Sequence, residues 1–87
     1  MEAHLTVEGL IARANSGRES LKRLEAHIRD FVAQLKQTRD AEGFNKEECI
    51  AHAMIALRAV EDARMRLGKV IQYADGGESV YDKPKTA

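Results

Sequence analysis

Three basic side chains, the residues best able to hold an anion, stand close together late in the sequence. They are Arg64, Arg66 and Lys69. Lys69 has no acidic residue three or four positions away on either side, so an ion pair along one helical face cannot balance its charge. We therefore predict that Lys69 bonds an external anion, such as a phosphate group.

The two arginines have plainer explanations. Arg66 follows Asp62 by four residues and Arg64 follows Glu61 by three, and both spacings favour ion pairs on a helix surface. Arg64 also falls on the apolar stripe of a predicted helix. An arginine in that position either extends to solvent, with its stem covering apolar surface, or meets a buried acceptor at a subunit junction.

Two aromatic rings and a glycine add to the candidate site. Tyr73 and Tyr81 are the only tyrosines in the chain, and either ring could stack on a purine base, a contact worth about 1 to 3 kcal/mol. Packing of the tail onto the helix is the plainer use for them. Gly68 costs about 1 kcal/mol in a helix interior, which indicates that something approaches the backbone there, and the pattern favours another helix over a ligand.

Nothing in the sequence indicates catalysis. The three histidines, at positions 4, 27 and 52, lack the mutual spacing of a metal site, and Cys49 is the only cysteine, so neither a zinc site nor a disulfide is predicted. There is no nucleophile elbow, phosphate-binding loop or pair of closely spaced carboxylates. We predict a protein that is not an enzyme and that needs no cofactor or metal.

The charge balance argues against long nucleic acids as partners. The 87 residues include 14 basic and 14 acidic side chains, whereas general nucleic-acid binding depends on neutralising many phosphates at once. No stretch approaches the roughly 20 apolar residues that cross a bilayer, and the first residues, with Glu2 and Glu8 among them, lack the pattern of a signal peptide. We predict a cytoplasmic protein without a membrane partner.

Two capping boxes predict two long helices that would position these residues. Ser16 with Glu19, and Asn45 with Glu48, each place a side-chain acceptor three residues before a carboxylate that can bond back to the backbone. Glycines are predicted to end both helices. A weaker, short helix capped by Thr6 is predicted before them and ends where the first long helix begins.

Apolar stripes predict how these helices pack. The first long helix carries a seam at alternating spacings of three and four, formed by Leu21, Leu24, Ile28, Phe31 and Leu35. The second carries a wider stripe of Ile50, Ala53, Leu57, Val60, Leu67 and Ile71, with further alanines beside it. The seam predicts an antiparallel partner helix crossing at about 20°, and the wider stripe exceeds what one partner can cover.

We therefore predict an all-α fold, made of a short N-terminal helix and a long antiparallel helical hairpin. Residues 1–77 would form this single domain and residues 78–87 a tail. A chain of 87 residues buries a small fraction of its surface, and neither a disulfide nor a zinc ion is available to staple it. Assembly as a homo-oligomer is therefore expected, with function at the junction between chains.

The last predicted helix resembles a known family. In the stretch 65–71 (Met-Arg-Leu-Gly-Lys-Val-Ile), Met-x-Leu is followed by a basic residue and by small or aliphatic ones, and a Gly-Gly stop and Ser-Val-Tyr-Asp at 79–82 come next. This stretch is similar to the ending of small helical-hairpin proteins that phages use against cyclic-nucleotide defence signalling, the anti-CBASS and anti-Thoeris sponge family. The length and the order of helices are similar too.

The resemblance implies sequestration without catalysis. The family forms homohexamers and holds cyclic di- or trinucleotides in pockets where protomers meet, so that host effectors are not activated. Lys69 matches the basic position of the family's final helix and would bond a ligand phosphate. The predicted ligand-binding residues are Lys69, Arg64, Arg66, Tyr73 and Tyr81. The expected location is then the cytoplasm of a bacterial host cell.

One part of the family's pocket has no direct counterpart. No aromatic residue precedes Phe31, so the stacking aromatic that the family carries in its N-terminal part would be replaced by His4 or by Tyr81 of a neighbouring protomer. Two other functions stay open. One is a phage accessory module whose helical hairpin binds another protein, and the other is a small nucleic-acid-binding regulator, which the balanced charge disfavours.

Overall fold

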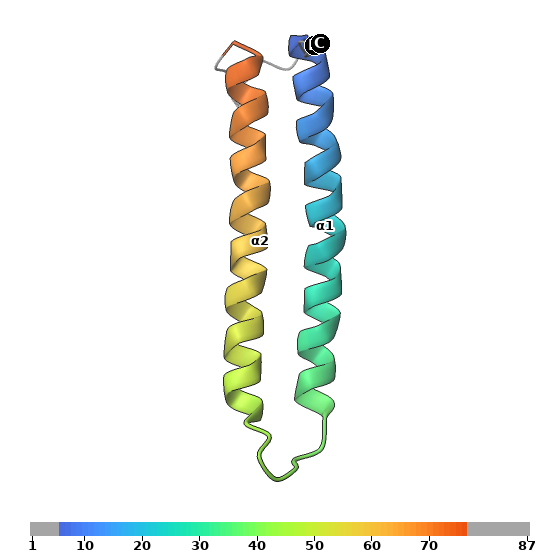
Figure 1. The fold of residues 1–87 in the computed structure, drawn as a ribbon, viewed down its shortest axis with the longest axis vertical. Coiled ribbons are helices and arrows are strands. Elements are labelled where there is room, and N and C mark those ends of the chain that lie inside the picture. The colour runs from blue at the N-terminus through green and yellow to red at the C-terminus, as the bar shows by residue number, and fades with distance from the viewer. Residues whose placement is uncertain (1–5, 77–87) are drawn as a thin grey trace, which may run out of the picture.

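The computed structural model describes residues 6–76, which form two long helices lying side by side (Figure 1). Helix α1 spans Val7–Gln37 and helix α2 spans Lys46–Ala74, and a loop over residues 38–45 reverses the chain between them. The described residues contain no strand. The predicted all-α antiparallel hairpin is confirmed. Neither described helix is long and apolar enough to cross a membrane.

Helix α1 is continuous through the point where the sequence predicts a break. The Thr6 cap is confirmed, because its hydroxyl accepts a hydrogen bond from the Gly9 N–H at 3.0 Å. The helix then runs through Ser16 to Gln37 without starting again. The predicted separate short helix and the predicted cap at Ser16 are therefore wrong.

Packing against α2 explains why the break does not form. Ala14 is buried between the helices. A Cβ atom added to Gly17 would lie only 3.0 Å from Leu67 Cδ1, so the missing side chain lets α2 come close at this point. Tertiary packing of an amphipathic face outweighs intrinsic propensity in most protein helices, and here it carries the helix through the weak Asn-Ser-Gly run.

Helix α2 begins where the sequence predicts. The Asn45 side chain accepts a hydrogen bond from the Glu48 N–H at 3.1 Å, which confirms the cap. Two acidic residues in the first turn, Glu47 and Glu48, face the positive end of the helix dipole. After the helix ends, Gly76 adopts φ +90°, a conformation that suits glycine.

The join between the helices repeats every seven residues, and we letter these positions a to g as in coiled coils. Positions a and d of α1, all buried or partly buried, are Ala14, Arg18, Leu21, Glu25, Ile28, Val32 and Leu35. Positions a and d of α2, which are also buried or partly buried, are Ile50, Ala53, Leu57, Val60, Arg64, Leu67 and Ile71. The stripe predicted for the second long helix is confirmed as part of this seam.

The seam predicted for the first long helix is wrong at two of its five residues. Leu24 and Phe31 are 42% and 48% exposed, and they occupy g positions beside the seam. Glu25 and Val32, the residues that follow them, face α2 instead and are buried. A glutamate can take a core position here because an arginine of α2 meets it, as described below.

Candidate binding surfaces

An ion pair between a buried glutamate and a partly exposed arginine joins the two helices near the middle of the seam. Glu25 is only 1% exposed, and its Oε2 lies 3.1 Å from Arg64 Nε. The expected buried acceptor for Arg64 therefore exists, but it belongs to the same chain and not to a subunit junction. The predicted pair between Glu61 and Arg64 is wrong, because Glu61 Oε2 lies 3.2 Å from Arg29 Nη2 of α1. Arg64 is thus bonded inside the hairpin.

A second arginine lies in the same part of the seam. Arg18 Nε is buried, and the part of the chain that the structure describes offers it no hydrogen-bond partner; the same is true of Glu25 Oε1. Arg18 Nε lies 3.9 Å from the point that a Cβ atom on Gly68 would occupy. This is an ordinary van der Waals distance, so the close approach expected at Gly68 is not seen within the hairpin.

Two other basic residues and one tyrosine that were predicted to bind a ligand lie together on the side of α2 that faces away from α1. Arg66, Lys69 and Tyr73, separated by three and four residues, share one helical side, and Tyr73 is 72% exposed. Arg66 Nε lies 3.9 Å from Asp62 Oδ1, so that predicted pair is confirmed. Lys69 Nζ donates to the Gln72 Oε1 at 3.4 Å, a neutral partner. We call these three residues the basic patch.

Two residues considered for the ligand site, Tyr81 and His4, lie outside the residues that the structure describes. Of the five predicted ligand-binding residues, the structure therefore brings three together, turns Arg64 inward and does not place Tyr81.

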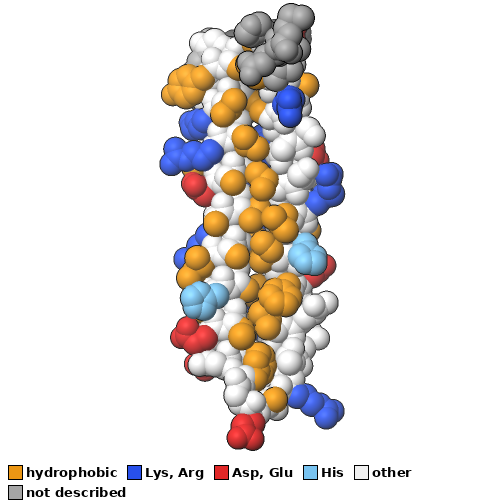
Figure 2. Space-filling view, viewed as in Figure 1, with side chains coloured by type: hydrophobic (Ala, Val, Ile, Leu, Met, Phe, Trp, Pro, Cys, Tyr) orange, Lys and Arg blue, Asp and Glu red, His pale blue; other side chains and the backbone are white. Residues whose placement is uncertain are grey.

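The g positions of both helices form a second surface, which we call the g face. Its members are Leu10, Gly17, Leu24 and Phe31 of α1 with Cys49, Ala56, Ala63 and Val70 of α2. In an antiparallel pair the g positions of the two helices lie on the same side of the seam. Val70 is 50% exposed, and the large g residues of α1, which are Leu10, Leu24 and Phe31, are exposed to a similar extent. In Figure 2 hydrophobic side chains run down the length of the hairpin where the two helices meet.

The opposite side of the seam, formed by the e positions, has a different chemistry. Basic residues occupy it on α1, at Lys22, Arg29 and Lys36, and acidic residues on α2 include Glu47 and Glu61. The ion pair between Arg29 and Glu61 crosses it. Met54 and Gly68 occupy the other e positions of α2. One side of the hairpin is therefore apolar, whereas the other carries charged side chains on both helices.

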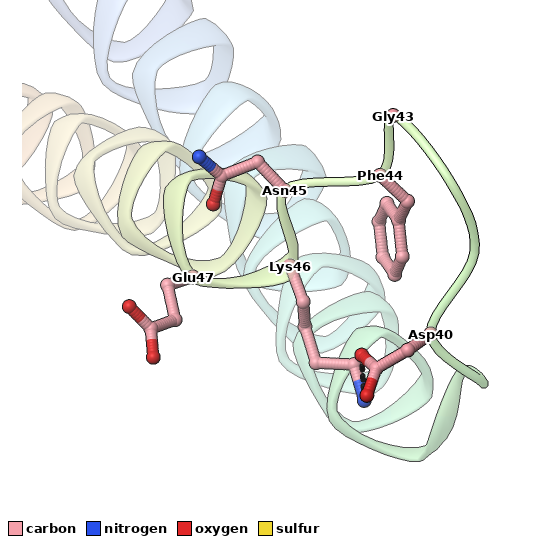
Figure 3. A pocket seen from close by; sticks show the side chains of 6 residues that line it. All are labelled: Asp40, Gly43, Phe44, Asn45, Lys46 and Glu47. Carbon is pink, nitrogen blue, oxygen red and sulfur yellow. Dashed lines mark ion pairs between the residues drawn. The ribbon is translucent and has the colours of Figure 1, made fainter.

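A shallow recess at the loop end combines charged and apolar residues (Figure 3). It is lined by Asp40, Gly43, Phe44, Asn45, Lys46 and Glu47. Lys46 Nζ lies 3.8 Å from Asp40 Oδ1 and 3.4 Å from the Lys36 carbonyl oxygen, so the cation of the recess already has partners. Phe44 packs against the core cluster around Val32. None of the predicted ligand-binding residues lines it.

Sequence reasoning missed the g face because it assigned Leu24 and Phe31 to the seam. The signal was present as a spacing of seven, both between these residues and along Ala56, Ala63 and Val70. No group of three or more His, Cys, Asp or Glu residues within the described part is arranged to hold a metal.

The chain matches no protein-family model, and comparison with curated proteins and with solved structures gave no match either.

Proposed function

We propose that this protein acts without catalysis, as a helical-hairpin module that associates with a second copy of itself through the g face. The observation that carries the proposal is the exposure of Leu24, Phe31 and Val70 along one side of a hairpin whose other side is charged. Exposed apolar residues that are contiguous, and not scattered singly, mark interaction surfaces.

The size of the core supports the same proposal. Within the described residues only five hydrophobic side chains are buried, Ala14, Val32, Leu35, Ala53 and Leu57. Two of these are alanines, so a single hairpin gains little from apolar burial. Full burial of a Leu, Phe or Val side chain contributes about 1.5 to 3 kcal/mol. Covering the exposed halves of the large g residues in two chains therefore adds several kcal/mol.

Sedimentation of the full chain tests the proposal. We expect a particle of at least twice the 9.7 kDa chain mass at micromolar concentration. Phe31→Glu should shift it to the monomer, because a carboxylate buried in the interface costs several kcal/mol. Ile55→Glu is the matched control, since Ile55 is equally large and exposed but lies outside the g face. A monomeric wild type, or equal effects of both substitutions, would overturn self-association through this surface.

A second proposal concerns the basic patch, namely the sequestration of cyclic di- or trinucleotides. Arg66, Lys69 and Tyr73 lie on one helical side, where an anionic ligand would take Arg66 from Asp62 and Lys69 from Gln72 and would meet an exposed ring. Hydrogen bonds between a cation and a phosphate are worth about 1.5 to 3 kcal/mol each, and base stacking on an aromatic ring adds about 1 to 3 kcal/mol. A symmetric assembly would repeat these contacts around a ligand that has several phosphates.

Calorimetry with a panel of cyclic di- and trinucleotides tests this second proposal. We expect submicromolar binding to one member, weaker binding of the matching linear dinucleotide, and a loss of at least tenfold for Lys69→Ala. Lys22→Ala, an exposed lysine on the e side, serves as the control. Absence of binding across the panel, or unchanged affinity in Lys69→Ala with an intact assembly, would rule out the basic patch as the site.

A further inference from the structure

Large and small side chains alternate across the g face in a way that fixes how a second copy would sit on it. The ion pair between Glu25 and Arg64 sets the register of the two helices. Leu24 precedes Glu25 and Ala63 precedes Arg64, so these g residues lie at nearly the same height along the hairpin. At this height α1 presents a large side chain and α2 a small one.

The same complementarity recurs one heptad in each direction. Toward the loop, Phe31 of α1 lies at the height of Ala56 of α2. Away from the loop the order reverses, because Gly17 of α1 contacts Leu67 and so lies within about 4.5 Å, along the hairpin, of Val70. At each of the three heights, one helix therefore projects a large side chain and the other leaves a space.

Two g faces can meet through a two-fold axis in either of two orientations. If the axis runs parallel to the helices, α1 of each copy lies over α2 of the other at the same height. Phe31 then meets Ala56 and Leu24 meets Ala63 of the second copy. If the axis runs across the helices, α1 lies over α1 and α2 over α2. If that axis passes at the height of Leu24 and Ala63, each of these two residues faces its own copy, so that a large side chain meets a large one and an alanine meets an alanine. One heptad away on either side, Phe31 faces Gly17 and Ala56 faces Val70.

Protein interiors are packed at uniform, crystal-like density. Only the parallel axis gives each pair of facing helices one large and one small residue at every height. We infer that a second copy of this chain occupies the g face with its two-fold axis parallel to the hairpin, which forms a four-helix bundle of antiparallel neighbours. The inference rests on the proposed self-association and adds its geometry.

The available area suits such a partner. The helices, of 31 and 29 residues, are about 45 Å long and lie about 10 Å apart. A face of this length and of two helices' width gives roughly 800 Å² per copy, the size of a standard stable interface. Both axes make every helix antiparallel to its two neighbours, so the opposed helix dipoles suit a four-helix bundle and do not distinguish the two orientations.

Cys49 provides a direct test, because it is exposed, is the only cysteine and lies on the g face near the loop. With a parallel axis, the two Cys49 residues lie at the same end of the bundle on diagonal helices, with backbones about 15 Å apart. With a crossing axis they lie near opposite ends, about 30 Å or more apart. Spin labels on Cys49 of the full chain should therefore report a main distance below about 25 Å by pulsed electron resonance.

A longer main distance in a labelled protein that still assembles would overturn the parallel arrangement and leave self-association intact. A labelled and an unlabelled protein that both sediment at 9.7 kDa would overturn self-association itself. The two failures are thus distinguishable.

Exchange of side-chain size gives an independent test that needs no label. Leu24→Ala and Ala63→Leu should each weaken assembly at least tenfold. Mixed together, the two variant chains should pair preferentially with each other, because every contact between positions 24 and 63 then joins one small and one large side chain. Native mass spectrometry should show mixed dimers in clear excess over random exchange.

Ala51→Leu provides the matched control for the exchange, because Ala51 is an exposed alanine of α2 outside the g face. Mixed with Leu24→Ala, it should give no excess. Mixed dimers of the first two variants at only the random proportion, with both variants helical by circular dichroism, would overturn contact between copies at this height of the g face, whereas the label distance alone decides the direction of the axis.

Discussion

Glu25 is the most deeply buried charged side chain among those that the structure describes, and Arg64 from the other helix meets it. Such a pair adds little net stability, because desolvation offsets most of the attraction. Its better-supported role is to set register. A slip of one heptad would move Glu25 from Arg64 toward Leu57 or Ile71 and leave a carboxylate among apolar side chains.

Removing the carboxylate alone should therefore be costly. Glu25→Ala leaves Arg64 without its acceptor, and because the Arg64 side chain is 36% exposed and can reach water, the free energy of unfolding is expected to fall by about 1 to 3 kcal/mol. Replacing Glu25 and Arg64 together by leucine should restore most of that loss, because a well-packed apolar pair needs no desolvation of charge. Urea unfolding followed by circular dichroism, at one fixed protein concentration, measures both effects.

The ion pair between Arg29 and Glu61 supplies the comparison, because both of its side chains are largely exposed. Glu61→Ala should cost less than about 1 kcal/mol. If Glu25→Ala cost no more than Glu61→Ala, the pair between Glu25 and Arg64 would have no structural role.

Residue types and spacing predicted some of the ion pairs at the candidate site and not others. They identified Arg66 with Asp62 correctly, since both members lie on one helix and four residues apart. They failed for Arg64, whose partner comes from the other helix and lies far away in the sequence. Spacing along one helix is enough to predict the contact between Arg66 and Asp62, whereas the contact of Arg64 depends on the register of the two helices.

Two glycines within the helices have different packing environments. A Cβ atom on Gly17 would lie 3.0 Å from Leu67 Cδ1, a tight contact, whereas one on Gly68 would meet only Arg18 Nε at 3.9 Å, an ordinary contact. Both glycines lie within helices, and neither has a positive φ. Close approach of the helices thus explains Gly17, and nothing in the structure explains Gly68.

Alanine substitutions should therefore separate the two positions. Gly68→Ala is expected to raise the free energy of unfolding by up to about 1 kcal/mol, the difference in helix propensity. Gly17→Ala gains the same propensity but must displace Leu67, so its net effect should be smaller or negative. Thermal unfolding of both variants beside the wild type tests this order. A larger gain for Gly17→Ala would contradict the close packing of α1 on α2 at that point.

The helices themselves were predictable where a single local interaction decides the boundary. Thr6 and Asn45 accept the capping bonds that their positions indicate. Ser16 carries the same signature and caps nothing, because the hairpin packs α2 against the turn around it. A capping box shows where a helix can begin, and tertiary contact decides whether it does.

The seam of the whole hairpin was only half predictable for a related reason. Leu21, Ile28 and Leu35 belong to both the predicted seam and the observed one. The heptad repeat can be completed either by Leu24 and Phe31 or by the residues that follow them, Glu25 and Val32. Counting apolar residues favours the first choice. The hairpin adopts the second, which leaves Leu24 and Phe31 exposed on the g face, as a partner would require.

If that face is covered in solution, the stability of the molecule should depend on its concentration. Binding to a partner stabilises the folded state by mass action, and with an unfolding enthalpy of about 0.7 kcal/mol per residue the thermal midpoint of a dimer rises by about 5 °C per tenfold increase in concentration. Phe31→Glu should remove this dependence and Ile55→Glu should retain it, because only Phe31 lies on the g face. Scanning calorimetry over a hundredfold range of concentration measures the slope. A midpoint that stays constant for the wild type would mean that the hairpin folds and persists alone, with its apolar side open to water.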